Sequence, residues 1–210
     1  MKLNMVPAAP NPTKVMLYIA ERNALGASMD IEQIVVNTLK GKQREPEHLA
    51  RNPFGALPVL EKDDGTFVIE SLSIIDYLEE FYPYGSLLGS DVDSRSSARE
   101  LERVVELRVF TPMARYIHAT NSPFGLPPDA KVASEIERSL PVAFDYLERI
   151  LGDGRDCLMG ELVSVADCTL QAGCQFARFG KAELLGDYPN LRGWDERYRK
   201  RPAALEVLKF

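Results

Sequence analysis

Residues 52–71 read NPFGALPVLEKDDGTFVIES, and this stretch decides how the first part of the chain folds. Two short apolar runs flank a turn at residues 63–65, which predicts a β-hairpin followed by a helix from Ser71. Pro58 stands at the entry of the first strand, where the missing N–H of proline is tolerated and turns often contain a cis bond. Leu57 therefore keeps a backbone N–H and C=O that can pair with a group outside the sheet.

The end of the hairpin places Glu70 and Ser71 at the start of the predicted helix. A helix N-terminus favours anions, because its free N–H groups and its dipole both attract negative charge. Together with the free backbone of Leu57, these residues predict a small peptide-like docking edge beside a carboxylate pocket. The alternative is that Glu70 and Ser71 only cap the helix.

Upstream of this stretch the pattern is strand, helix, strand. Asn11 followed by Pro12 predicts a helix start, with Asn11 as N-cap and Pro12 as the first helical residue. The predicted order is a strand at 1–6, a helix from 11, a strand at 31–36, a short helix at 47–51, the hairpin, and a helix at 71–82. This β-α-β-α-β-β-α order predicts an α/β module of thioredoxin type over residues 1–83.

The remainder of the chain is helical in pattern. A segment rich in Pro, Gly and Ser predicts a linker at 84–91, followed by an all-α module over residues 92–210. Helices are expected at 93–118, at 129–151 with a disturbance near Pro141, from Ser164, and from about Leu191 with an interruption at Pro202. Ser164 and Asp167 fit a variant of the capping box, in which an N-cap side chain and an acidic residue three positions later bond reciprocally.

Composition limits the function classes. The chain has 210 residues, 45% of them apolar, and a net charge of −6, which argues against nucleic acid as a partner. The basic residues at 197–201 are interpreted as a solvated helix end. No apolar run approaches the roughly 18 residues of a membrane span, so no membrane partner is expected.

The cysteines and histidines are few. Three late cysteines without C-x-x-C spacing read as small buried side chains, and His48 and His118 alone support no metal site. The N-terminal segment is too short and too soon broken by Pro7 for a signal peptide. These features predict a reduced, cytoplasmic protein.

The order of these landmarks matches a known family. The chain resembles cytosolic glutathione transferases, especially bacterial ones, over essentially its whole length. The matching pieces are PNPTKV at 10–15, NPFGALPVL at 52–60, ES at 70–71, SVAD at 164–167, YPNL at 188–191, Trp194, and RP at 201–202. The resemblance implies a thioredoxin-like N-terminal domain, an all-helical C-terminal domain, a homodimer, and a role in detoxification.

The resemblance also implies how glutathione is held. Leu57, before a cis-Pro58, would pair its backbone with the cysteinyl unit. Glu70 would face the γ-glutamyl amine and Ser71 the γ-glutamyl carboxylate. Lys42 and Gln43, in a polar loop, are candidates for the glycyl carboxylate, although both also read as ordinary solvated loop residues.

The catalytic position departs from the common family pattern. Many relatives place Tyr, Ser or Cys near the start of the first helix, but residues 6–13 here read VPAAPNPT. The N-terminal module has no cysteine, which excludes a mixed-disulfide mechanism through the protein. Asn11 is the remaining candidate, through its side-chain amide and the helix N-terminus, with Thr13 second. Asn11 could also be only a cap.

By family analogy, the electrophile would lie between the two modules. Candidate lining residues, which could equally belong to the helical core, are Phe110, Met113, Tyr116, Ile117 and Phe124. The expected activity is glutathione transfer to a small apolar electrophile. Two other readings remain: a glutathione-dependent disulfide reductase or peroxidase that works without a protein cysteine, and a glutathione-binding or interaction module without catalysis.

Overall fold

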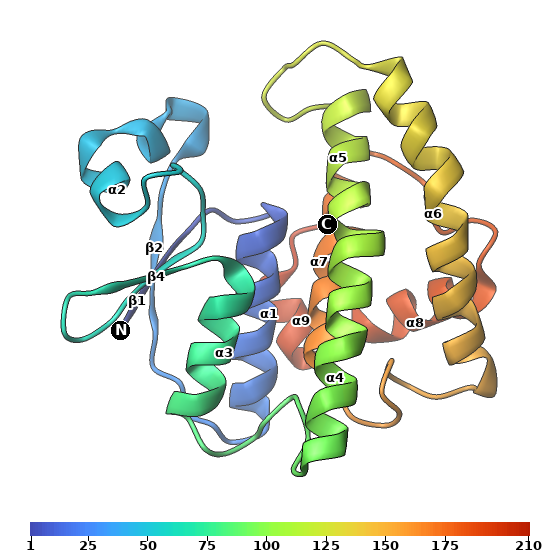
Figure 1. Ribbon diagram of the computed structural model, residues 1–210, viewed down its shortest axis with the longest axis horizontal. Helices are drawn as coiled ribbons and strands as arrows, with labels where there is room; N and C mark the ends of the chain where they lie inside the picture. Colours follow the sequence, from blue (N-terminus) through green and yellow to red (C-terminus); the bar gives the residue numbers. More distant parts are fainter.

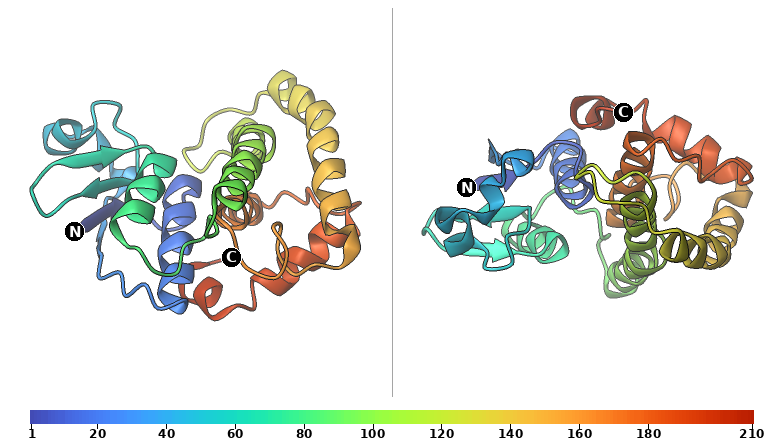
Figure 2. Two further views of the ribbon diagram at one scale, coloured as in Figure 1. Left: turned by 60° about the horizontal axis from the view of Figure 1, so that its bottom comes forward. Right: turned by 90° about the horizontal axis from the view of Figure 1, so that it is seen from above.

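The computed structural model describes residues 1–210 and has two modules, visible side by side in Figure 1 and Figure 2. The first module holds a four-stranded sheet with the order β2-β1-β3-β4, in which β1 and β2 are parallel and the other pairs are antiparallel. Its elements are β1 (Lys2–Met5), α1 (Pro10–Ala24), β2 (Glu32–Val35), α2 (Pro46–Arg51), β3 (Val59–Glu61), β4 (Phe67–Ile69) and α3 (Ser71–Phe81). The predicted thioredoxin-like order is confirmed.

The second module is entirely helical. Its elements are α4 (Val92–Val105), α5 (Thr111–Thr120), α6 (Ala130–Ile150), α7 (Val165–Phe179), α8 (Pro189–Tyr198) and α9 (Pro202–Val207). A π-helical turn, Glu106–Phe110, joins α4 to α5, so the predicted helix at 93–118 is continuous but contains one widened turn. Pro141 lies inside α6. None of the helices combines the length and apolar character that crossing a membrane requires.

Helix α7 forms the centre of the helical module and packs against α1, α4 and α5. Its N-terminus carries the predicted capping box: Asp167 accepts from the Ser164 backbone N–H at 2.9 Å, and from the Ser164 hydroxyl at 2.7 Å. The same buried carboxylate accepts from the indole of Trp194 on α8 at 2.9 Å. Burial raises the pKa of Asp167, and these donors oppose that effect.

The two modules share one apolar core, which extends from Leu3 in β1 to Val207 in α9. Helix α1 lies at their junction and packs against α3 on one side and against α7 and α9 on the other (Figure 1). The interpretation of residues 197–201 as a solvated end is wrong for Arg201. Its guanidinium forms two 2.8 Å contacts with buried Glu21 of α1, a partner that lies far away in sequence.

Candidate functional site

The loop before β3 is built to present Leu57. The side chain of buried Asn52 accepts from the Phe54 N–H at 3.1 Å and donates to the Ala56 carbonyl at 3.0 Å, which closes the turn. Gly55 has a φ of +62°, and a Cβ there would lie 2.9 Å from the Gln43 carbonyl oxygen. The Leu57-Pro58 peptide bond is cis, as expected. No hydrogen bond within the chain involves the backbone of Leu57.

Glu70 and Ser71 lie where β4 meets α3. The helix begins at Ser71, and Glu70 is the N-cap residue but makes no side-chain capping bond, so capping does not explain either residue. Glu70 is exposed and has a φ of +68°, which is costly for a residue other than glycine and is typical of functional positions. The Ser71 hydroxyl instead donates to Oδ1 of Asn11 at 3.0 Å.

This hydrogen bond joins α3 to the first turn of α1. The prediction that Asn11 is the N-cap is wrong, because α1 begins at Pro10, two residues before the predicted Pro12, with Ala9 as N-cap. Pro10 and Pro12 both fit the first turn of a helix, and the prediction from sequence used Pro12. Since Ser71 donates to Oδ1, the amide NH₂ of half-buried Asn11 is left without a partner in the chain.

The first turn of α1 offers few other donors. Pro10 and Pro12 have no N–H, and the Thr13 N–H donates to the Ala9 carbonyl at 3.0 Å. The backbone N–H of Asn11 is therefore the one free main-chain donor in this turn. The Thr13 side chain is 1% exposed and accepts from Gln175 of α7 at 3.0 Å, so its hydroxyl belongs to the junction between the modules.

Lys42 and Gln43 lie in a short 3₁₀ helix, Lys42–Arg44, beside the loop that presents Leu57. The exposed ammonium of Lys42 pairs with Glu45 at 2.7 Å. The side-chain oxygen of Gln43 is enclosed and has no hydrogen-bond partner. The structure thus brings this segment to the docking edge, with Lys42 paired and Gln43 unpaired.

A cavity of about 270 Å³ lies between the modules at the start of α1. The N-terminal module contributes the β1–α1 connection, and the helical module contributes aromatic residues from α5, α7 and the loop after α5. The lining residues are Val6, Pro7, Ala8, Ala9, Pro10, Thr38, Leu39, His118, Pro123, Phe124, Phe176 and Phe179. We call this cavity the cleft. Its character is apolar and aromatic, and Ala8 at its edge has a φ of +67°.

Of the five residues expected to line an electrophile pocket, the structure places Phe124 on the cleft. Phe110, Met113 and Ile117 are at most 2% exposed and lie in the core of the helical module, and Tyr116 donates to Glu137 at 2.9 Å. Those four do not line the cleft, because helical periodicity identifies an apolar face without saying what covers it.

His118 is a cleft residue that sequence reasoning missed. Its ring stacks on Phe124 with an interplanar angle of 2° and a centroid distance of 5.8 Å, and Nδ1 lies 3.3 Å from the Ser122 hydroxyl. Nε2 has no partner in the chain. Burial lowers the pKa of His118 from its ordinary value of 6.5, so the neutral imidazole dominates at pH 7. It is the one titratable side chain among the cleft-lining residues.

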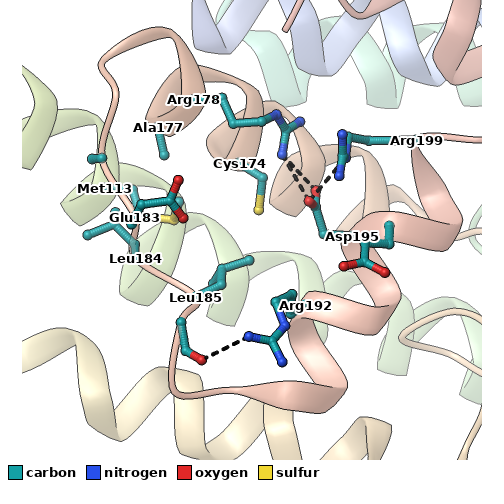
Figure 3. Close-up of a pocket in the computed structure, with 13 residues that line it drawn as sticks. Met113, Cys174, Ala177, Arg178, Glu183, Leu184, Leu185, Arg192, Asp195 and Arg199 are labelled. Carbon is teal, nitrogen blue, oxygen red and sulfur yellow. Dashed lines mark hydrogen bonds and ion pairs between the residues drawn. The ribbon is translucent and has the colours of Figure 1, made fainter.

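A second cavity of about 260 Å³ lies inside the helical module, between α7, α8 and the loop that joins them (Figure 3). Its arginines are already engaged. Arg178 and Arg199 both point to Asp195, at 2.9 and 3.2 Å, and Arg192 donates to the Gly186 carbonyl (Figure 3). This cavity does not adjoin the residues expected to bind glutathione, so the candidate site is the cleft and the edge beside it.

Comparison with known proteins agrees with this geometry. Residues 3–87 match the family "Glutathione S-transferase, N-terminal domain" and residues 107–202 match "Glutathione S-transferase, C-terminal domain". Glutathione S-transferase F10 of Arabidopsis thaliana is 32% identical, over 85% of each chain. The chain belongs to the glutathione S-transferase family.

Other relatives support the assignment. Glutathione S-transferase 2 of Saccharomyces cerevisiae is 29% identical over 97% of this chain and 88% of its own length. The crystal structure of Gtt2 from Saccharomyces cerevisiae superposes with a TM-score of 0.86 at 28% identity, covering 99% of this chain and 100% of the other. This glutathione S-transferase thus keeps the family fold, and the first turn of its α1 presents the side-chain amide of Asn11.

Proposed function

We propose that this glutathione transferase binds glutathione along the edge from Leu57 to Ser71 and activates its thiol at the first turn of α1. The thiolate then attacks a small apolar electrophile held in the cleft. The observation that carries the proposal is the 3.0 Å hydrogen bond from Ser71 to Asn11. It joins the binding edge to the thiol-activating residue and orients the Asn11 amide with its NH₂ free.

The binding roles follow from which groups are unpaired. The free N–H and C=O of Leu57 suit the cysteinyl backbone, and the unpaired carboxylate of Glu70 suits the γ-glutamyl ammonium. Because the Ser71 hydroxyl proton is directed to Asn11, we assign the γ-glutamyl carboxylate to the free N–H groups of the first turn of α3. The glycyl carboxylate falls to Gln43, through its amide NH₂, or to Lys42 after exchange with Glu45.

Asn11 would stabilise the thiolate without taking the proton. An ordinary thiol has a pKa of about 8.5, and lowering it by about two units requires about 2.7 kcal/mol. An amide donor to an anion supplies about 1.5–3 kcal/mol, and a helix N-terminus at most about 2 kcal/mol. The two prolines of the first turn leave α1 one free main-chain donor, so the side-chain amide of Asn11 carries most of this stabilisation.

His118 is the group that can accept the proton. Its neutral imidazole lines the cleft at the start of α1, with Nε2 free. We assign it as general base, directly or through a water molecule. In the proposed step the thiol proton passes to His118, the sulfur forms a bond to the electrophilic carbon, and the leaving group departs with its electron pair. The aromatic lining favours planar apolar electrophiles, which suits a detoxification role.

The other readings lack a supporting observation. For a reductase or peroxidase without a protein cysteine, the cleft that would receive the second substrate is apolar and aromatic, which favours transfer instead. A reductase that forms a mixed disulfide on the protein would need a cysteine at the site. Cys157, Cys168 and Cys174 are at most 2% exposed, and burial raises the pKa of each thiol. All three cysteines are free, which supports the proposed cytoplasmic location. A pure binding module would not require an orienting bond to Asn11.

We also propose a homodimer. Phe54 in the N-terminal module is 68% exposed, and a groove of about 630 Å³, lined by apolar residues and by charged ones such as Glu100 and Arg149, lies between α4, α5 and α6. Leu107 and Val142 on this groove are 53% and 74% exposed. In a two-fold dimer each copy can place its Phe54 in the partner's groove. Phe54→Ala should yield a monomer in sedimentation analysis, whereas a dimer of unchanged affinity would exclude this contact.

The proposed function is tested by retention on immobilised glutathione followed by conjugation of glutathione to an activated aryl halide. The wild type should be retained and should turn over. Asn11→Ala should be retained but should lose at least about tenfold in kcat. Asn23→Ala, at the other end of α1, is the matched control and should keep kcat. Retention without turnover by the wild type would indicate a binding module, and loss of retention would refute the assigned edge.

A further inference from the structure

We propose that Lys14 is a positioning residue, which holds the first turn of α1 in place through an ion pair with Glu106 of the helical module. The inference rests on the proposed function, because the group that it positions is Asn11. Lys14 lies three residues after Asn11, one helical turn along α1. Its role is not to touch glutathione but to fix the amide that does.

The charged and cation–π contacts of the Lys14 ammonium all come from the helical module. Its side chain is 0% exposed, and its ammonium bonds the carboxylate of Glu106, which is 16% exposed. Glu102, one turn earlier on α4, lies at 3.8 Å, and the ring of Phe110 lies at 5.0 Å. Glu106 and Phe110 bound the π-helical turn between α4 and α5. The widened turn therefore faces the start of α1.

The neighbouring residue is tied in the same direction. Thr13 accepts from Gln175 of α7 at 3.0 Å, and Gln175 in turn accepts from the Lys209 backbone N–H at 2.6 Å. Residues 13 and 14 thus attach the first turn of α1 to α7 and to the π-helical turn. The N-terminal module alone offers Asn11 only the bond from Ser71.

A matched contact exists at the other half of α1. Glu21, 2% exposed, pairs with Arg201 at 2.8 Å and also joins α1 to the helical module. Glu21 lies ten residues after Asn11, about 15 Å along the helix axis. Both ion pairs hold the modules together, but only the one at Lys14 adjoins the proposed thiol site. Breaking each ion pair in turn therefore distinguishes a positioning effect on the thiol site from a general loosening of the junction between the modules.

The test compares Lys14→Gln, Glu106→Gln, Lys14→Arg and Arg201→Gln. Three measurements are made: the pKa of the bound glutathione thiol by ultraviolet titration, hydrogen exchange of the amides of Thr13 and Lys14, and steady-state kinetics for kcat and KM. Lys14→Gln and Glu106→Gln should both raise the thiol pKa, speed exchange, and lower kcat by about tenfold with little change in KM. Lys14→Arg keeps the positive charge and should therefore show the thiol pKa, exchange and kcat of the wild type. Arg201→Gln should leave the thiol pKa unchanged.

Other outcomes overturn the proposal or the function on which it rests. If Lys14→Gln and Glu106→Gln shifted the thiol pKa in opposite directions, the charge of each side chain would affect the thiol, and not the ion pair between them. An equal shift in Arg201→Gln would mean that any loosening of the junction suffices. If the wild type itself shows no thiolate and no turnover, the proposed function fails. Hydrogen exchange then tests separately whether the Lys14–Glu106 ion pair holds the first turn of α1. Faster exchange in Lys14→Gln and Glu106→Gln supports this part of the proposal, and unchanged exchange refutes it.

Discussion

The two ends of α1 are held in different ways. At the C-terminal end, fully buried Arg22 bonds the hydroxyl of Tyr18, pairs with Glu79 at 3.0 Å, and donates to the carbonyls of Tyr82 and Tyr84 at 2.5 and 2.7 Å. These partners belong to the N-terminal module and to the segment that follows α3. This end is closed, because both terminal nitrogens of Arg22 are engaged within the fold, while its enclosed Nε has no partner.

At the N-terminal end, partners come from across the junction and several groups stay open. Lys14 bonds Glu106 of the helical module, while the side-chain NH₂ of Asn11 and the Leu57 backbone have no partner within the chain. Open donors beside an apolar cavity are what a ligand site requires. One helix thus stabilises the module at one end and presents the proposed thiol site at the other.

The largest effect is expected at the closed end. Arg22→Met should reduce the free energy of unfolding by about 3–5 kcal/mol, because it leaves the carboxylate of Glu79 buried without its partner. Denaturant unfolding measures the loss. The thiol pKa of bound glutathione should not change, and a shift would show that the two ends are not separate.

A smaller effect is expected at Ser71. Ser71→Ala removes the hydrogen bond that orients Asn11, worth about 1 kcal/mol, so kcat should fall about fivefold while glutathione affinity changes little. Calorimetric titration and steady-state kinetics measure the two quantities. Ser73→Ala, exposed on the same helix, is the control. A variant that lost affinity but kept kcat would show that Ser71 binds glutathione without positioning Asn11.

The smallest effect concerns pH. Because burial lowers the pKa of His118, the unfolded chain binds a proton at higher pH than the folded chain does. The contribution of His118 to stability is complete above about pH 6.5 and is lost as the pH falls. His118→Phe should therefore lose less thermal stability than the wild type between about pH 7 and about pH 5. Equal losses would contradict the assigned direction.

The sequence predicted the elements that depend on local chemistry. Residues 52–60, NPFGALPVL, predicted the turn, the strand and the cis-proline, because Asn, Gly and Pro have specific backbone and side-chain roles there. Ser164 and Asp167 predicted the start of α7, because their capping bonds form within a few residues of one another. Asn11 and Ser71 were each selected on the sequence, but their hydrogen bond was not foreseen, since 60 positions separate them.

What failed depends on contacts between distant segments. Arg201 reads as a solvated charge until α1 brings buried Glu21 against it. Phe110 and Phe124 are equally apolar in sequence, yet one lies in the core and the other on the cleft, because the covering segments decide. His118 carried no local signal beyond being one of two histidines. Its place on the cleft becomes visible only when α5 and the start of α1 line one cavity.

The central claim is that the Asn11 amide stabilises the glutathione thiolate, and ultraviolet titration of the bound thiol tests it most directly. The measurement compares the wild type with Asn11→Ala, and uses Asn23→Ala as control. The account predicts a bound-thiol pKa well below the free value of about 8.5 in the wild type and the control, and a rise of about one unit or more in Asn11→Ala. An unchanged thiol pKa in Asn11→Ala would contradict it.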